Sequence, residues 1–293
     1  MPYLLKDCNI PVYGTPLTMG LVGNKLKEHN LVSSARLNVV NAGDVVKMGC
    51  MDVELIHVNH SIPDSVGVAI HTPAGTLVHT GDFKIDCTPA AGTITDLTRF
   101  AELGKEGVLA LMADSTNAER PGYTKTEAKV QESFERLFVR AQNRRIIIAT
   151  FASNINRIQQ IVNCAYANNR KVAFSGRSML NYMQVATELG YVDVPQGVII
   201  DIDSLNQYTP EQIVLVTTGS QGESMAALSR MAANIHKKIT IKPNDAIIFS
   251  SHPIPGNEKA VSKVINELSM KGAKVIFQDV HVSGHACQEE IKL

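Results

Sequence analysis

Short apolar stretches, separated by turn residues, make up most of the first third of the chain. They predict strands at Val45–Met48 and Met51–Val58. A second pair of stretches, Val66–His71 and Thr76–Thr80, flanks the turn residues Pro73–Gly75 and predicts a hairpin. The first third is therefore expected to be rich in β-structure.

Helical periodicity interrupts this region twice, at Thr18–His29 and at Asp96–Leu103. Val108–Ala113 is a continuous apolar stretch that ends at Asp114 and predicts a buried strand. The first part of the chain is thus expected to combine strands with a few helices.

After residue 120 the pattern changes to alternating helices and strands. The helices are expected at Lys125–Gln142, Asn154–Asn168, Met179–Leu189 and Asn257–Lys271, and the strands at Arg145–Phe151, Lys171–Ser175, Val214–Thr217, Ala246–Ser250 and Ala273–Gln278. Such alternation predicts a parallel sheet with right-handed crossovers. Ligands of parallel sheets bind at the carboxyl ends of the strands, where several polar clusters of this chain lie.

A length of 293 residues predicts about two domains, and 44% hydrophobic with 19% charged residues is typical of an ordinary globular protein. The formal net charge of zero excludes a protein that coats nucleic acid through bulk charge, but a local basic groove remains possible. Two basic clusters, Arg140 with Arg144 and Arg145, and Lys237 with Lys238, are either phosphate contacts or solvated surface.

The number and spacing of the cysteines help to predict the cellular compartment of the protein. The chain has five cysteines and no Cys-x-x-Cys, which argues against a disulfide framework and against a cysteine zinc ribbon. It has no signal-peptide pattern at its start and no apolar stretch long enough to span a membrane. We therefore expect a cytoplasmic protein without a membrane partner.

Two polar clusters follow predicted strands in the first part of the chain, His60–Ser65 and His79–Asp86. Imidazole and carboxylate groups are good ligands for zinc or manganese. Gly81 would let the backbone turn sharply and direct the carboxylate of Asp82. Each cluster could equally be ordinary turn and surface residues.

Three more clusters carry possible chemistry. In Ala113–Asn117 the carboxylate of Asp114 is either functional or a cap of the following segment. The small residues of Thr217–Glu223 expose backbone N–H groups that suit phosphate oxygens. His281–His285 places two imidazoles and a hydroxyl within five residues, and imidazole is the side chain best suited to proton transfer near neutral pH.

Five sequence motifs together resemble ribonuclease J, a bacterial and archaeal ribonuclease family in the β-CASP branch of the metallo-β-lactamase superfamily. The motifs are HTGDFKID at His79–Asp86, DSTNAERPG at Asp114–Gly122, TGSQGE at Thr218–Glu223, PIPGNE at Pro253–Glu258 and HVSGHACQEE at His281–Glu290. The resemblance implies an α/β fold, with a partial metallo-β-lactamase αββα sandwich and an inserted parallel α/β β-CASP domain. It places the sandwich at residues 1–115, the β-CASP domain at 116–280 and the return to the sandwich at 281–293.

The resemblance also implies roles for particular residues. His60 and Asp82 match metal ligands, and the family holds two divalent ions, usually zinc, with manganese also implicated. Asp82, Asp114 and His285 match catalytic positions, and His285 would contact the phosphate and assist proton transfer. The residues expected to bind RNA phosphates are Phe151, Ala152, Ser153, Ser220, His281, Val282, Ser283, Gly284 and His285.

The function implied is metal-dependent hydrolysis of RNA, from the 5′ end towards the 3′ end and also internally, in RNA maturation and decay. The substrate would be single-stranded RNA with a 5′-monophosphate end, bound mainly through its backbone. Family members form homodimers, tetramers or RNA-degradation assemblies, so such partners are expected.

The chain departs from the family in one respect. It lacks the metal-binding motif His-x-His-x-Asp-His, and the motif matches indicate truncation at both ends. An alternative is therefore a non-catalytic RNA-binding or partner subunit of a ribonuclease J assembly. A third possibility is a metallo-β-lactamase-fold hydrolase of small molecules, which the β-CASP motifs disfavour. His252, before PIPGNE, is either an extra phosphate contact or an incidental polar residue.

Overall fold

The computed structural model describes residues 1–89, 92–277 and 280–293, which divide into two compact units. The first unit comprises Met1–Glu127 together with Ser283–Leu293, and the second comprises Ala128–Val282. The first break falls later than residue 115, where the first domain was expected to end. In the described part of the chain, no helix has the length and apolar character needed to cross a membrane.

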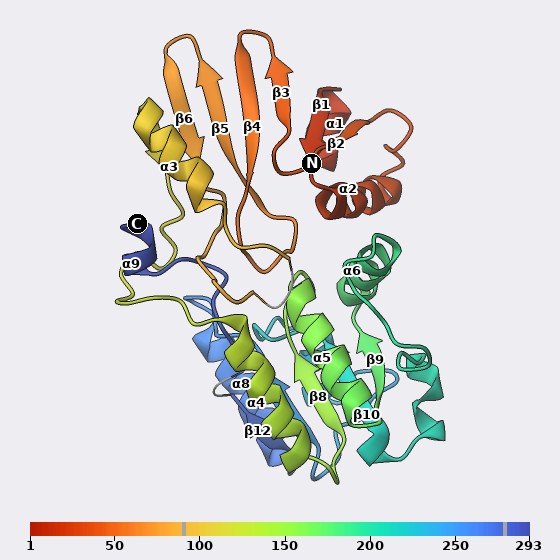
Figure 1. The fold of residues 1–293 in the computed structure, drawn as a ribbon. Coiled ribbons are helices and arrows are strands. Elements are labelled where there is room, and N and C mark those ends of the chain that lie inside the picture. The colour runs from red at the N-terminus through yellow and green to blue at the C-terminus, as the bar shows by residue number, and fades with distance from the viewer. Residues whose placement is uncertain (90–91, 278–279) are drawn as a thin grey trace. The chain divides into compact units, whose positions relative to one another are not determined.

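A five-stranded sheet forms the centre of the first unit (Figure 1), with the strand order β3-β4-β5-β6-β7. The strands are β3 (Val45–Met48), β4 (Met51–His57), β5 (Val66–Thr72), β6 (Gly75–His79) and β7 (Val108–Met112). The first four pair antiparallel through short turns, and β7 joins β6 in parallel. These elements confirm the strands predicted from the apolar stretches.

Helix α3 (Leu97–Glu106) packs on one face of this sheet (Figure 1). Asp96 caps its first turn by accepting a hydrogen bond from the N–H of Arg99, which explains where the helix begins. Its buried Leu103 and half-buried Phe100 contact Ile56, Ala69 and Val78 of the sheet. The predicted helix at residues 96–103 is thus confirmed, and the structure extends it to Glu106.

Strand β7 differs from its prediction because it is not buried. Its continuous apolar sequence is typical of a buried strand, yet all five residues are exposed. The reason is its position, since among the described strands it lies at the edge of the sheet and pairs with β6 alone.

The N-terminal elements were only partly predicted. They are α1 (Pro2–Asp7), β1 (Pro11–Gly14), α2 (Pro16–Glu28) and β2 (Arg36–Val39). The predicted helix at Thr18–His29 corresponds to α2. Strands β1 and β2 pair in parallel over four residues each, and their sequences, Pro-Val-Tyr-Gly and Arg-Leu-Asn-Val, contain too few apolar residues to indicate a strand. They share a small core with Leu5, Met19 and Leu26.

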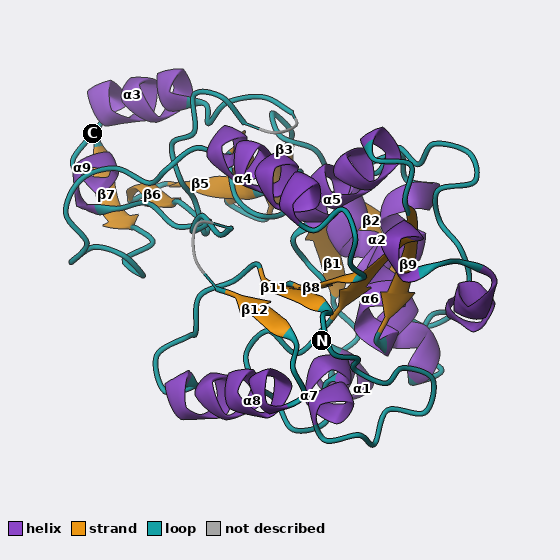
Figure 2. Cartoon of the chain, turned by 90° about the horizontal axis from the view of Figure 1, so that it is seen from below, coloured by secondary structure: helices purple, strands orange, loops and turns teal. Residues whose placement is uncertain are grey.

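The second unit contains a five-stranded parallel sheet with the order β12-β11-β8-β10-β9. Its strands are β8 (Ile146–Ala149), β9 (Lys171–Ser175), β10 (Ile213–Thr217), β11 (Ala246–Phe249) and β12 (Lys274–Ile276). Helices cover both faces, with α4 (Glu127–Arg140) and α5 (Ile155–Ala167) on one side and α7 (Ala227–Ala232) and α8 (Glu258–Met270) on the other (Figure 2). The predicted parallel α/β region is therefore confirmed.

The remaining elements of the second unit are α6 (Arg177–Glu188) and two short 3₁₀ helices, η1 (Ile202–Gln207) and η2 (Pro210–Gln212). Neither 3₁₀ helix nor α7 was predicted, because each has too few residues to show a helical period. The last expected strand was Ala273–Gln278, and its final residue, Gln278, lies outside the described residues. The chain returns to the first unit with the short helix α9 (Gln288–Ile291).

Candidate functional site

Asp82 lies in a sharp turn after β6. Gly81 has a φ of +64°, and a Cβ added to it would lie 2.7 Å from the carbonyl oxygen of Val66. Only glycine therefore fits this turn, as the sequence indicated. The side chain of Asp82 is 65% exposed and its carboxylate is available to a ligand.

His60 follows β4 and lies beside Asp82. Its Nδ1 is 2.8 Å from the carbonyl oxygen of Gly284, and because that oxygen can only accept, Nδ1 carries the proton. The lone pair of Nε2 is then free, and Nε2 lies 3.9 Å from Oδ2 of Asp82. Burial lowers the pKa of His60 more than the hydrogen bond to Gly284 raises it. The imidazole is therefore held neutral, which is the form that binds a metal ion.

His285 is oriented by a buried carboxylate. Its Nδ1 lies 2.7 Å from Oδ2 of Asp114, whose side chain is 3% exposed. Burial raises the pKa of Asp114, but hydrogen bonds from the N–H of Thr116 and from His285 outweigh it, and the net pKa is lowered. The ionised Asp114 thus accepts from Nδ1–H of His285 and leaves Nε2 available.

Three of these side chains converge on one point. The ligand atoms of His60, Asp82 and His285 all lie within 4.8 Å of one another, and the two imidazole rings are 5.0 Å apart between centroids. Two imidazoles and a carboxylate form a donor set typical of zinc, with Nδ1 of each ring already engaged by a carbonyl or a carboxylate. The residues present therefore fit one divalent ion.

The segment that carries His285 is held by a polar network. The amide of Asn117 donates to the hydroxyl of Ser283 over 2.8 Å and to the carbonyl of His285 over 3.2 Å. The hydroxyl of Thr124 also donates to that carbonyl. These contacts fix the backbone on either side of Gly284 and therefore the position of the His285 ring.

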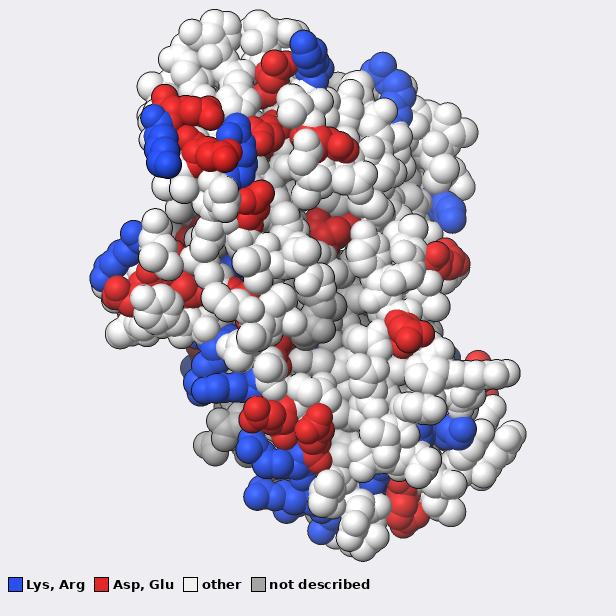
Figure 3. Space-filling model, in the orientation of Figure 1, with Lys and Arg blue, Asp and Glu red and all other residues white. Residues whose placement is uncertain are grey.

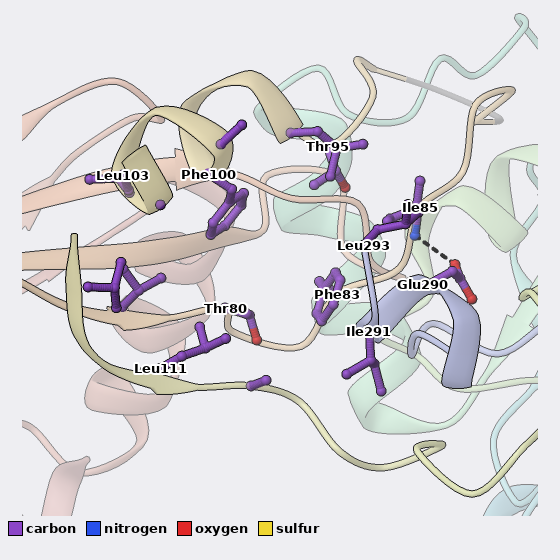
Figure 4. Close-up of a pocket in the computed structure, with 16 residues that line it drawn as sticks. Thr80, Phe83, Ile85, Thr95, Phe100, Leu103, Leu111, Glu290, Ile291 and Leu293 are labelled. Carbon is purple, nitrogen blue, oxygen red and sulfur yellow. Dashed lines mark hydrogen bonds between the residues drawn. The ribbon is translucent and has the colours of Figure 1, made fainter. Parts of the chain in front are cut away.

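Glu290 ties the same segment to two others. Its buried carboxylate accepts from the N–H groups of Ile85, Thr124 and Cys287, over 2.9, 2.6 and 2.8 Å respectively. Figure 4 shows the bond to Ile85 at the rim of an apolar pocket of about 580 Å³. Glu290 thus connects the loop after Asp82 to the end of the chain.

The other predicted phosphate-binding residues lie in the second unit. Phe151, Ala152 and Ser153 follow β8, and Ser220 follows β10, so both groups lie at the carboxyl edge of the parallel sheet. Ser220 is buried, at 2% exposure. His281 and Val282 end this unit, whereas Ser283, Gly284 and His285 belong to the first unit.

His252 packs against His281 in the second unit, with ring centroids 4.9 Å apart and an edge-to-face arrangement. The loop that carries His252 is fixed by Gln221, whose amide donates to Ser251 and to the carbonyl of His252. The amide oxygen of Gln221 accepts from the N–H of Ile254. The TGSQGE and PIPGNE motifs are therefore physically joined through Gln221.

Each of the two basic clusters contains a cation that is already paired with a carboxylate. Arg145 is buried and donates from Nε to Asp245 over 3.1 Å, so it is not a surface cation. Lys238 pairs with Asp203. On the face drawn in Figure 3, basic and acidic side chains are intermixed over α4. This intermixing favours the solvated-surface interpretation.

Several supporting residues were not predicted from the sequence. Asn117 and Glu290 lie within the motifs that carry the resemblance, but nothing in their spacing shows what they contact. Asn59 and Thr95 are buried beneath His60 and Asp82, at 7% and 3% exposure. For Thr95 the sequence offers no signal, because it is a common residue in a loop far along the chain from both ligands.

Comparisons with known proteins agree on one family. Residues 143–268 match the family model described as "Ribonuclease J, beta-CASP domain". The ribonuclease J of Helicobacter pylori is 47% identical over 296 residues, which covers 100% of this chain and 43% of that protein. Ribonuclease J2 of Bacillus subtilis is 44% identical, covering 99% of this chain and 53% of the relative, and ribonuclease J of Thermus thermophilus is 45% identical, covering 100% and 52%.

One solved structure shows the same fold. A protein of unknown function from Enterococcus faecalis matches with a TM-score of 0.67 at 14% identity, covering 97% of this chain and 66% of that chain. The curated relatives supply the family, because their identity extends over almost all of the 293 residues. The chain therefore belongs to the ribonuclease J family, and it spans about half the length of the curated relatives it matches.

Proposed function

We propose that this chain carries the catalytic site of a metal-dependent ribonuclease that hydrolyses RNA phosphodiester bonds. The observation that carries the proposal is the convergence of His60, Asp82 and His285 within 4.8 Å, with each imidazole oriented through Nδ1. A catalytic zinc site commonly uses three protein ligands and leaves one position open. This donor set meets that requirement for one ion.

A bound divalent ion, zinc or manganese, would polarise a phosphodiester and activate a water molecule. His60 and Asp82 are proposed to hold it. Nε2 of His285 is proposed either to complete the ligand set or to contact the scissile phosphate, as the family resemblance implies. In both cases Asp114 orients the ring through Nδ1. The second ion that the resemblance implies would need ligands beyond these three groups.

The proposed substrate is single-stranded RNA with a 5′-monophosphate end, cut in the 5′-to-3′ direction and internally. Two observations support it: the relatives are named ribonuclease J, and small polar residues follow β8 and β10 at the carboxyl edge of the second unit. A cytoplasmic location and a homo-oligomer or RNA-degradation assembly are part of the same proposal.

The test compares RNAs of one sequence with 5′-monophosphate and 5′-triphosphate ends, with zinc or manganese added to the purified chain. We expect faster loss of the monophosphate substrate, and at least about 100-fold slower turnover in Asp82→Asn. His29→Gln, which alters a partly buried imidazole that meets the ring of Tyr3 edge-on, is the control. Equal turnover in Asp82→Asn and in the unchanged chain would refute the assignment.

A second candidate is a non-catalytic RNA-binding or partner subunit. It is favoured by the small number of ligand groups, three among the described residues. This candidate predicts RNA crosslinking without turnover at any metal concentration. Affinity that falls steeply with salt would indicate that phosphate contacts dominate.

A further inference from the structure

The segments that carry His60 and Asp82 are joined beneath the site by one buried hydroxyl, that of Thr95. This side chain belongs to the loop before α3 and is 3% exposed. It lines the apolar pocket together with Phe100 and Ile85 (Figure 4). A hydroxyl in such surroundings is costly unless both its donor and its acceptor capacity are used.

Both capacities are used, and each reaches a different ligand segment. Oγ1 of Thr95 accepts from the backbone N–H of Asn59 over 2.8 Å, next to His60. It donates to the backbone carbonyl of Lys84 over 2.9 Å, two residues after Asp82. The same two segments also meet directly, because the N–H of Lys84 donates to the carbonyl of Asn59 over 2.8 Å.

The side chain of Asn59 completes this connection from the other side. Its Oδ1 accepts from the N–H of Thr95 over 3.0 Å, and its Nδ2 donates to the carbonyl of Thr93 over 2.6 Å. The Thr93–Thr95 segment is therefore bonded to Asn59 through both backbone and side chain. Loss of the Thr95 hydroxyl would leave the N–H of Asn59 buried without its acceptor.

The Lys84 end is anchored as well. The ammonium of Lys84 is 3% exposed and lies 3.1 Å from Oδ2 of Asp86 and 3.4 Å from Oε1 of Glu127. Both carboxylates are also buried. The backbone of Lys84 is thus held in two ways, through the ion pairs of its own side chain and through the hydrogen bond from Thr95. These contacts limit the movement of Asp82, two residues earlier.

We propose that Thr95 is a positioning residue that sets the separation of His60 and Asp82 for metal binding. The inference rests on the proposed function, since the geometry that Thr95 would set is that of the proposed metal site. A ligand held by an outer hydrogen bond loses metal affinity when the bond is removed, by about 10–100-fold.

The test uses the full chain and titrates cobalt(II), followed by its visible absorption. Thr95→Val removes the hydroxyl and keeps the shape, and we expect its dissociation constant to rise at least about tenfold. Thr95→Ser restores the hydroxyl and should recover most of the affinity. Thr93→Val makes the same chemical change two residues away, at an exposed side chain, and should bind cobalt as the unchanged chain does.

A second control separates positioning from loss of stability. Leu103→Ala removes a core side chain of the same unit without touching Asn59, Thr95 or Lys84, so it should lower the Tm and leave the cobalt affinity unchanged. The proposal would be overturned if Thr95→Val lowered the Tm but bound cobalt with unchanged affinity.

An observation without metal keeps this inference separate from the proposed function. In the metal-free chain, imidazole ¹⁵N signals of His60 should shift or broaden in Thr95→Val and remain unchanged in Thr93→Val. If the unchanged chain binds no cobalt, the proposed metal site is refuted. The ¹⁵N signals of His60 in the metal-free chain still test whether Thr95 positions that ring. Unchanged His60 signals in Thr95→Val would then refute the positioning role.

Discussion

Gly284 leaves no room for a side chain beside His60. A Cβ added there would lie 2.7 Å from Nδ1 of His60 and 2.7 Å from the hydroxyl oxygen of Ser61. The φ of Gly284 is not positive, so the constraint is the close approach of His60 and not the backbone conformation. This glycine therefore permits the hydrogen bond that fixes the protonated nitrogen of His60.

Gly284→Ala is expected to displace His60 and to weaken cobalt binding at least about tenfold. Overpacking should also cost about 1–3 kcal/mol in the free energy of unfolding. Isothermal titration and chemical denaturation measure the two effects. Gly23→Ala is the control, because nothing lies within 4 Å of its Cβ inside α2, and it should stabilise the chain by about 0.5–1 kcal/mol. Unchanged metal binding in Gly284→Ala would contradict the expectation.

Asp86 makes stability depend on pH. Burial raises the pKa of Asp86, but the N–H of Glu127 and the ammonium of Lys84 outweigh it, so the net pKa lies below its ordinary value. A carboxyl whose pKa is lowered by folding contributes stability above its unfolded pKa of about 3.9 and loses it as pH falls through the folded pKa.

Asp86→Asn should therefore lower the free energy of unfolding at pH 7 by about 3 kcal/mol, because the buried Lys84 loses one partner. The difference from the unchanged chain should shrink as the pH falls below about 3.9. Urea denaturation at several pH values measures both curves. A difference that stays constant down to the lowest pH would show that ionisation of Asp86 is not responsible.

The sequence could predict the proposed ligands of this site better than the residues that support them. His60, Asp82 and Gly81 stand in short motifs whose chemistry is visible one residue at a time. The roles of Asn59, Thr95 and Glu290 depend on which backbone groups come within reach, and those groups lie up to 205 residues away along the chain. No local sequence pattern indicates which of these distant backbone groups come together.

At the level of secondary structure, two similar apolar strands have opposite environments. Strand β7 is Val-Leu-Ala-Leu-Met and is exposed along its whole length, whereas β10 is Ile-Val-Leu-Val-Thr and is buried along its whole length. Pairing decides the difference, since β7 has one neighbouring strand and β10 lies between β8 and β9. Apolar sequence alone therefore predicted both strands correctly, but it could not predict which one is buried.

The same substitution should act very differently on these two strands. Leu109→Lys in β7, at a side chain that is 62% exposed, should change the free energy of unfolding by less than about 0.5 kcal/mol. Leu215→Lys in β10, at 0% exposure, should cost more than about 4 kcal/mol, because it buries an unpaired charge. Denaturant titrations of the two variants measure both changes in the free energy of unfolding. Similar losses for both variants would mean that β7 is covered in solution.

Periodicity predicted the longer elements and missed the short ones. The longer helices of the second unit, α4, α5, α6 and α8, and its five strands were predicted, although most of their boundaries moved by one or two residues. Strands β1 (Pro-Val-Tyr-Gly) and β2 (Arg-Leu-Asn-Val) contain too few apolar residues to indicate a strand, and the four residues of α9 make little more than one helical turn.

On the scale of the whole molecule, the two units have separate hydrophobic cores. Leu103 belongs to the core of the first unit, and Leu215 belongs to that of the second. We expect two calorimetric transitions, as is common for chains with more than one domain. Leu103→Ala should lower the temperature of one transition and Leu215→Ala that of the other. Each substitution should cost about 2–5 kcal/mol in the free energy of unfolding of its own unit. One shared transition that shifts equally in both variants would contradict this.

The discontinuous first unit has a consequence for biosynthesis. Gly284 accepts the hydrogen bond from His60 across 224 residues, and the whole second unit is encoded between them. At roughly 5–20 residues per second, a ribosome needs about 10–45 s to travel from one to the other. During that interval His60 and Asp82 emerge without His285, so the proposed metal centre can form only after the whole second unit has been synthesised.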